Sequence, residues 1–280
     1  MQSLVQIVLI GAPGSGKGTQ ARLLSQQYGI PQISTGELLR QAVQSRLPLG
    51  LEAQAVMDQG LLVSDTIVMG IIRDRLVQPD ARSGFLLDGF PRNLEQAQAL
   101  EKLLETLDRP LTVAILFQMD SEYLIQRLSG RLTCPQCGAV YNRYTSPPRF
   151  DDQCDNCGTL LRHRSDDNEE TIINRLRVYE AQTEPLIGFY RSRGLLAEIN
   201  ADGPIPTIFR QIRRVINEHR QRRAPLRPRK GKVPARQSKS PAAARTARRV
   251  STTSAKKKSK PRNLPPAKKR SGKAKKTRSH

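Results

Sequence analysis

An apolar run that enters a glycine-rich loop constrains the fold of this chain more than any other feature. Residues 5–10 read VQIVLI, and their apolar, mostly β-branched side chains predict a buried strand of a parallel sheet. The loop GAPGSGKGT, residues 11–19, follows at once, and a helical pattern extends from about residue 17 to residue 28. In this order of elements, backbone N–H groups at a helix N-terminus can surround a phosphate. The segment is therefore a candidate P-loop, in which Lys17 reaches the β- and γ-phosphates of a nucleotide.

The loop departs from the general P-loop motif at one position. That motif has Ser or Thr directly after the lysine, where its hydroxyl contacts magnesium. Here the position holds Gly18, and Thr19 comes one residue later. A glycine-rich turn without a ligand is the alternative interpretation. The strand, the spacing, the lysine and the helix together favour a phosphate site.

The remaining hydrophobic pattern alternates between the two kinds of secondary structure. Further strands are predicted at residues 32–34, 84–88, 111–119 and 195–200, and helices at residues 94–107, 122–128 and 169–193. This alternation predicts an α/β fold, with a parallel sheet of about five strands covered by helices on both faces. Two inserts interrupt it: a helical, polar segment at 34–63, and a segment at 131–167 that is rich in Cys, Pro, Gly and charge. The predicted core then comprises residues 1–33, 64–130 and 168–219.

Charge divides the chain into two unlike parts. Residues 220–280 contain 24 Lys/Arg and no Asp or Glu, whereas the first 219 residues contain 23 Lys/Arg and 25 Asp/Glu. The basic tail also has no Phe, Tyr or Trp, so it cannot bury enough apolar surface to offset the entropy of ordering. We expect residues 220–280 to be disordered, with a composition similar to that of histone-H1-type tails. Such a tail attracts polyanions, among them nucleic acid bound without sequence preference, although a plain solubility or localisation role stays open.

The four cysteines all lie in the second insert. They form two Cys-x-x-Cys pairs, Cys134 with Cys137 and Cys154 with Cys157, separated by 16 residues, and a glycine follows each pair. This spacing predicts a structural zinc site of four thiolates, whose binding energy would fold a segment with little apolar core. Redox-active or disulfide-bonded cysteines, a metal-free segment and a zinc ribbon for nucleic acid are the alternatives. No apolar run approaches the roughly 20 residues of a membrane span, so we expect a cytoplasmic protein.

Several motifs in order resemble adenylate kinases and their nucleoside monophosphate kinase relatives. They are GAPGSGKGTQA at residues 11–21, ISTG at 33–36 followed by Arg40, FLLDGFPR at 85–92 followed by Gln96, and then Arg131, the four cysteines, RSDD at 164–167 and Arg175. The resemblance covers about residues 5–218 and leaves the tail outside. It implies a monomeric enzyme with a zinc-bearing lid at 131–167 and a monophosphate-binding insert at 34–63. The implied reaction is ATP + AMP = 2 ADP with Mg²⁺.

The resemblance also implies roles for individual residues. The ATP-binding set is Gly14, Ser15, Gly16, Lys17, Gly18, Thr19, Arg127, Arg131, Val140, Tyr141 and Ile205. The AMP-binding set is Thr35, Gly36, Arg40, Leu61, Leu62, Val63, Gly89, Phe90, Arg92, Gln96, Arg164 and Arg175. Lys17, Arg92, Arg131, Arg164 and Arg175 are the candidate catalytic residues. Asp88 would hold magnesium through water, and Asp166 and Asp167 would pair with arginines.

Three other functions remain open at this stage. A UMP/CMP or GMP kinase shares the scaffold, although Thr35 and Gln96 favour adenine. A P-loop ATPase without an acceptor would leave the DGFPR segment unexplained. A kinase scaffold used mainly for nucleic-acid binding would explain the tail but not the intact set of site residues.

Overall fold

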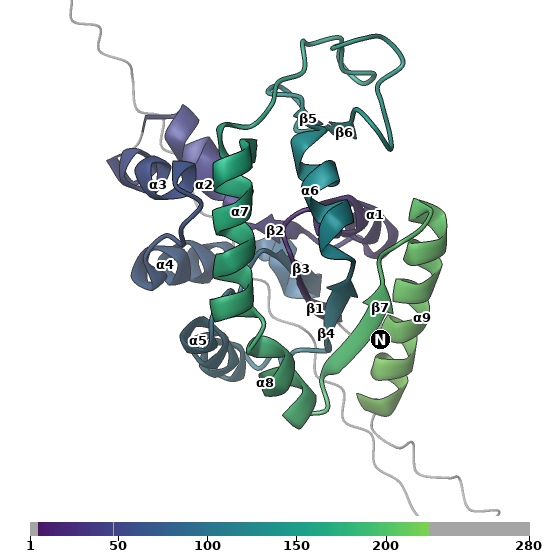
Figure 1. Cartoon of the computed structure of the whole chain (residues 1–280). Helices are drawn as coiled ribbons and strands as arrows, with labels where there is room; N and C mark the ends of the chain where they lie inside the picture. The colour runs from purple at the N-terminus through teal and green to yellow at the C-terminus, as the bar shows by residue number, and fades with distance from the viewer. Residues whose placement is uncertain (1–4, 47, 224–280) are drawn as a thin grey trace, which may run out of the picture. The chain divides into compact units, whose positions relative to one another are not determined.

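A five-stranded parallel sheet forms the centre of the computed structural model, which describes residues 5–46 and 48–223 (Figure 1). The strand order is β2-β3-β1-β4-β7, and every neighbouring pair is parallel. The strands are β1 (Val5–Gly11), β2 (Gln32–Ser34), β3 (Gly84–Asp88), β4 (Val113–Gln118) and β7 (Leu196–Asn200). The α/β fold class predicted from the alternation of strands and helices is confirmed.

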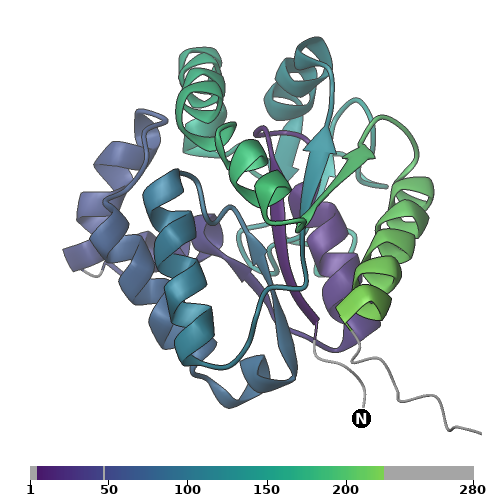
Figure 2. The same ribbon diagram turned by 90° about the horizontal axis from the view of Figure 1, so that it is seen from below.

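Helices cover both faces of this sheet, as the view from below shows (Figure 2). They are α1 (Lys17–Tyr28), α2 (Thr35–Gln44), α3 (Pro48–Asp58), α4 (Asp65–Leu76), α5 (Leu94–Thr106), α6 (Ser121–Ser129), α7 (Glu169–Val178), α8 (Leu186–Ser192) and α9 (Ile205–Arg223). Short helical turns lie at η1 (Pro79–Ser83), η2 (Ser165–Asp167) and η3 (Tyr179–Thr183).

The side chains of β1 alternate between two hydrophobic cores. Val8 and Ile10 pack into the core that also contains buried residues of α4, α5 and α8, whereas Ile7 and Leu9 pack into the core shared with α1 and α9. Successive side chains of a strand point to opposite faces, so a central strand must be apolar on both. This requirement explains why the run that enters the glycine-rich loop is apolar at nearly every position.

The register of the sheet brings two loops together at one edge. Leu9 of β1 pairs with Asp88 of β3, and Gly11 pairs with Phe117 of β4. The carboxyl end of β3 therefore lies beside the glycine-rich loop. Ligands of open parallel sheets bind at this edge.

The cysteine-rich insert carries a small antiparallel sheet of its own, β5 (Arg131–Thr133) and β6 (Val140–Asn142). Its core consists of five buried residues, Leu132, Cys134, Ala139, Cys154 and Leu161. Two of the five are cysteines, so aliphatic packing alone contributes little stability there.

Some element boundaries differ from the sequence prediction. The helix predicted at residues 169–193 is divided into α7, η3 and α8, because Pro185 has no N–H to donate within a continuous helix. Helices α4 and α9 were not predicted individually. Helix α9 extends through Arg223, past the predicted boundary at residue 219, and residues 224–280 of the predicted tail lie outside the described residues. None of the helices described here is long and apolar enough to cross a membrane.

Candidate active site

A cleft of about 1000 Å³ opens over the carboxyl edge of the sheet. The glycine-rich loop, Asp88 and the insert that contains β5 and β6 all line it. Most of the residues that the sequence assigned to ATP or AMP line this cleft, and Thr35, Leu61, Val63 and Gln96 line a smaller cavity that shares several of its residues. Phe90 is the exception, since it is fully buried in the core beneath the site.

The backbone of the glycine-rich loop requires glycine at two positions. Gly14 and Gly16 have φ angles of 87° and 89°, a region that other residues rarely adopt. A Cβ on Gly14 would also lie 3.0 Å from the carbonyl oxygen of Leu124. The loop therefore keeps a wrapped conformation of the kind that binds a phosphate through backbone N–H groups, although the N–H of Ser15 donates to the Ala12 carbonyl at 3.2 Å.

Lys17 folds back across the loop from the first turn of α1. Its Nζ donates hydrogen bonds to the carbonyl oxygens of Gly11 at 2.7 Å and Ala12 at 2.8 Å. Burial lowers the pKa of Lys17 to about 8, although the nearby Asp88 carboxylate opposes this shift. A poorly solvated ammonium at the mouth of the loop is well placed to bind phosphate oxygens.

Gly18, the departure from the general motif, lies beside Asp88. A Cβ at this position would lie 3.4 Å from Oδ2 of Asp88. Asp88 also accepts a hydrogen bond from Nε2 of Gln32 at 3.2 Å.

Two arginines from separate elements line the same cleft, Arg40 of α2 and Arg92 of the loop after β3. The Arg92 Nε donates to the carbonyl oxygen of Gly89 at 2.8 Å, and the Thr35 hydroxyl donates to the same oxygen at 2.8 Å. Burial and the proximity of Arg175 and Arg40 lower the pKa of Arg92 to about 10, so it remains cationic at neutral pH. Burial likewise lowers the pKa of Arg40. Guanidinium groups in this setting are suited to bidentate recognition of a phosphate.

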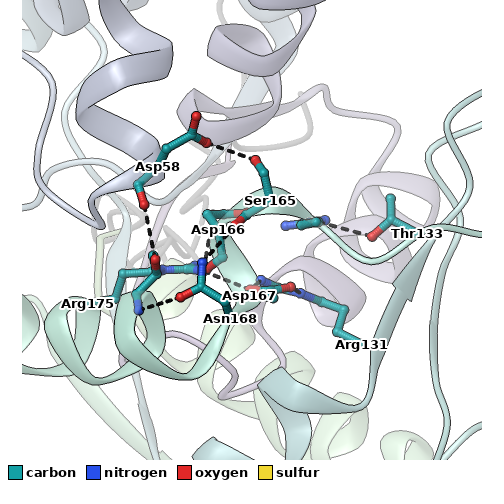
Figure 3. A network of polar contacts seen from close by, with 10 residues as sticks. Asp58, Arg131, Thr133, Ser165, Asp166, Asp167, Asn168 and Arg175 are labelled. Atoms are coloured by element: carbon teal, nitrogen blue, oxygen red, sulfur yellow. Dashed lines mark hydrogen bonds and ion pairs between the residues drawn. The ribbon is translucent and has the colours of Figure 1, made fainter.

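Buried carboxylates tie the arginines of the insert to helix α7 (Figure 3). Arg131 donates from Nε to Oδ2 of Asp167 at 2.6 Å, and Arg175 donates to Oδ1 of the same carboxylate at 2.8 Å. Arg175 also lies 3.1 Å from Oδ2 of Asp166. The expected pairing of Asp166 and Asp167 with arginines is confirmed.

Asp166 and Arg164 show how strongly these charges interact. Burial opposes ionisation of Asp166, yet Arg175, Arg40 and Arg131 hold its pKa below the usual value. Arg164 donates from Nε to the Thr133 hydroxyl at 3.0 Å, and burial together with neighbouring arginines lowers its pKa to about 9.

The helical insert is joined to the segment that precedes α7. Asp58, the last residue of α3, accepts a hydrogen bond through Oδ1 from the Ser165 hydroxyl at 2.9 Å (Figure 3). Its carbonyl oxygen accepts a second from Thr171 at 3.0 Å. These contacts bring both inserts against the same cleft.

Val140, Tyr141 and Ile205, which the sequence analysis predicts to flank the adenine of ATP, all line the cleft. The Tyr141 hydroxyl accepts from the N–H of Asp155 at 2.9 Å and lies 3.6 Å from the Cys154 sulfur, so this side chain points toward the cysteines. The Ile205 carbonyl oxygen accepts from Nε2 of Gln20 at 3.0 Å. Val140 is partly exposed at the cleft surface.

The four cysteine sulfurs form one cluster. All lie within 4.8 Å of one another, and two pairs, Cys134 with Cys157 and Cys137 with Cys154, are 3.5 Å apart. A disulfide would need about 2.05 Å, whereas tetrahedral Zn–S bonds of about 2.3 Å place sulfurs about 3.8 Å apart. Gly138 and Gly158, with φ angles of 69° and 70°, donate their N–H groups to the carbonyls of Cys134 and Cys154. The donor set and its spacing fit zinc.

Sequence reasoning missed several contacts that shape this site. Arg22 of α1 donates to the Gly138 carbonyl at 2.8 Å, across 116 residues, and Asp65 of α4 accepts from Nε2 of Gln96 at 2.6 Å. No local pattern marks these residues, since a charged residue on a helix ordinarily faces solvent.

The sequence matches a family model and is similar to several known proteins. The family model described as adenylate kinase matches residues 9–195. The chain is 57% identical to the adenylate kinase of Nitrosococcus oceani over 217 aligned residues. The alignment covers 77% of this chain and all of that protein. It is 51% identical over 208 residues to that of Thermodesulfovibrio yellowstonii, covering 74% of this chain and 97% of the relative. The adenylate kinase of Methanothrix thermoacetophila is 47% identical over 214 residues, 76% of this chain and 99% of the relative.

We expect Asp167→Asn to lower the free energy of unfolding by about 3–5 kcal/mol, because it leaves the guanidinium groups of Arg131 and Arg175 without their shared anion. Asp80→Asn is the matched control, since the Asp80 carboxylate pairs with Arg75 but its side chain is 55% exposed against 0% for Asp167. The control should cost less than about 1 kcal/mol. Urea denaturation of both variants measures the difference, and equal losses would contradict the assigned role of Asp167.

Proposed function

The chain belongs to the adenylate kinase family, and we propose that it catalyses reversible, Mg²⁺-dependent transfer of a phosphoryl group between ATP and AMP to form two ADP. The observation that carries this proposal is the convergence of cations from separate elements on one cleft. Lys17 comes from the start of α1, Arg40 from α2 and Arg92 from the loop after β3. Arg131 begins β5 and Arg175 lies on α7, and all five line the same cleft. Phosphoryl transfer between two anionic nucleotides needs this distribution of positive charge.

In this proposal the ATP phosphates occupy the glycine-rich loop. The N–H groups of Gly14–Thr19 and the ammonium of Lys17 bind them. Arg131 approaches from the lid, residues 131–167, and Arg127 approaches from α6, the helix that precedes the lid. Val140, Tyr141 and the backbone at Ile205 flank the adenine. The positive end of α1 favours the same anion.

AMP occupies the other half of the cleft. Arg40 and Arg92 hold its phosphate, with Gly36 and Phe90 shaping the surroundings. Thr35, Leu61, Leu62, Val63, Gly89 and Gln96 surround the adenosine in the cavity that they line or border. We assign Mg²⁺ to Asp88 through water, since this carboxylate ends β3 beside the P-loop.

The chemistry is supplied mainly by position and charge. Arg164 and Arg175 neutralise the transferring phosphoryl group together with Lys17, Arg92 and Arg131. This role requires no general base. The insert at 34–63 and the lid must close over the nucleotides, because open access would let water accept the phosphoryl group.

We propose that the four cysteines hold one structural zinc ion. A site closed by four thiolates leaves no open position for substrate, so the metal would stabilise the lid rather than take part in the reaction. Because the cysteines are free thiols grouped for a metal, we also propose a cytoplasmic location. We also propose that the enzyme acts as a monomer.

A second activity, polyanion binding by the basic tail, is supported by one further observation. The relative from Nitrosococcus oceani is matched over its whole length by 217 residues, so the tail is additional to the part that the two proteins share. Helix α9, which leads into the tail, already exposes Arg210, Arg213, Arg214 and Arg222. We propose that this basic extension binds nucleic acid through its phosphates, without reading base sequence.

We expect Lys17→Met to reduce the rate of ADP formation by about 10³-fold or more, because the variant lacks the ammonium that binds the β- and γ-phosphates. The assay supplies ATP with AMP, UMP, CMP or GMP in turn, and the melting temperature of the variant should match that of the unchanged protein. Full activity of the variant would remove Lys17 from the mechanism. Preference for another monophosphate over AMP would overturn the base assignment.

Elemental analysis should give about one zinc per chain. Cys154→Ser should lose the zinc and become more susceptible to proteolysis within residues 131–167, while the sheet remains protected. The matched control is Gln153→Ser, an exposed neighbour outside the sulfur cluster, which should keep its zinc. Unchanged proteolysis of zinc-free protein would contradict a structural role for the metal.

The full chain should shift random duplex DNA in a gel at low salt, and a chain that ends at Arg223 should bind far more weakly. Log affinity should fall with log salt by roughly 0.9 for each phosphate neutralised. The shortened chain should keep its kinase activity, since every residue assigned to the chemistry precedes position 224. Equal binding by both chains, or binding insensitive to salt, would exclude this role for the tail.

A further inference from the structure

The side-chain amide of Gln96 is bonded at both of its ends. Its Nε2 donates to Oδ1 of Asp65 at 2.6 Å, and its Oε1 accepts from the backbone N–H of Arg92 at 2.8 Å. Gln96 is only 2% exposed, yet it lines the cavity assigned to the adenosine of AMP. The amide is therefore held from the protein side while it faces the ligand.

These two partners permit one orientation of the amide. A carboxylate only accepts hydrogen bonds and a backbone N–H only donates, so the NH₂ must face Asp65 and the oxygen must face Arg92. Rotating the amide by 180° would place its oxygen against the carboxylate and its NH₂ against the N–H of Arg92. Both contacts would then be mismatched at a buried site, where unpaired polar groups are costly.

Asp65 and Arg92 are themselves held in place. Nδ2 of Asn93 lies 3.1 Å from each oxygen of the Asp65 carboxylate, and Oδ1 of Asn93 caps α5 by accepting from the Gln96 N–H at 2.8 Å. The carbonyl oxygen of Arg92 accepts from the Thr183 hydroxyl at 2.7 Å. The orientation of the amide thus depends on a network that joins α4, α5 and η3.

A fixed amide can distinguish two classes of purine. Adenine presents an N6 amino donor beside the N1 acceptor, whereas a 6-oxo purine presents an O6 acceptor beside an N1–H donor. The second hydrogen on Nε2 and the second lone pair on Oε1 match the first pattern, and only the rotated amide matches the second. A site with buried groups that cannot adapt rejects the mismatched ligand strongly.

We propose that Asp65 is a specificity-determining positioning residue, which orients the amide of Gln96 so that a 6-amino purine monophosphate is accepted and a 6-oxo purine monophosphate is rejected. This inference rests on the proposed assignment of AMP to the cavity beside Gln96. Asp65 acts through Gln96 and does not itself contact the nucleotide.

The test compares AMP with IMP as acceptors, because the two differ only at positions 6 and 1 of the base. In Asp65→Asn, the amide of Asn can donate to a rotated Gln96, which leaves one mismatch in place of two. We expect the ratio of kcat/KM for AMP to that for IMP to fall about tenfold or more, a change of about 1.4 kcal/mol per factor of ten. The KM for ATP should stay unchanged.

Asp74→Asn is the matched control, since it removes the same charge from an exposed position of the same helix. It should leave the ratio unaltered. An Asp65→Asn protein that is folded and active but keeps the original ratio would overturn the inference.

If Asp65→Asn does not fold, Asn93→Asp provides an independent test. Aspartate keeps the oxygen that caps α5 but repels the Asp65 carboxylate, so the ratio should again fall. An unchanged ratio in this variant would overturn the inference as well. An unchanged protein that phosphorylates IMP as well as AMP would instead refute the base assignment in the proposed function, so the two failures are distinguishable.

Discussion

Mutual repulsion among clustered cations is the constraint on which the rest of this structure depends. Burial lowers the pKa values of Arg40 and Arg92, and the nearby charge of Arg175 lowers both of them further. Such a cluster persists only where carboxylates offset part of its charge, and the shared anion of Asp167 does so for Arg131 and Arg175. The balance stays positive in the cleft, so the site still favours an anionic ligand.

The charged side chains of the cleft come from two parts of the fold, the sheet and the inserts. The sheet supplies the rigid part, because the paired ends of β1 and β3 bring the P-loop and Asp88 together at one edge. The inserts supply further cations that line the cleft, Arg40 from the first insert and Arg131 and Arg164 from the second, and in the proposed function these close over the nucleotides. Their small cores agree with this role, since the lid contains five buried residues, two of them cysteines. A segment with so little apolar burial could move as a unit if the proposed zinc ion holds it together.

Buried strands could be predicted from the sequence, whereas the exact ends of the helices could not. Strands such as residues 84–88 are recognisable because burial on both faces demands a continuous apolar run. Helix α7 was predicted to continue to residue 193, but Pro185 and the π turn at η3 interrupt it, and periodicity alone does not detect such a change. The basic residues of α9 were assigned to the tail from residue 220 onward, although the helix continues through Arg223. Composition shows where the chain becomes basic and loses its acidic residues, but it does not show where the last turn of a helix ends.

The sequence by itself determined the short local motifs of this protein. The strand, glycine-rich loop and helix of residues 5–28 and the two Cys-x-x-Cys pairs are specified by residues close together in the chain, because backbone conformation and ligand spacing are local properties. Only the tertiary structure decided that Asp167 serves two arginines, that Asp58 joins one insert to the other, and that Asp65 orients Gln96. The partners in these contacts lie between 8 and 107 residues apart in the sequence. The more distant partners meet only because sheet topology and helix packing bring their segments together.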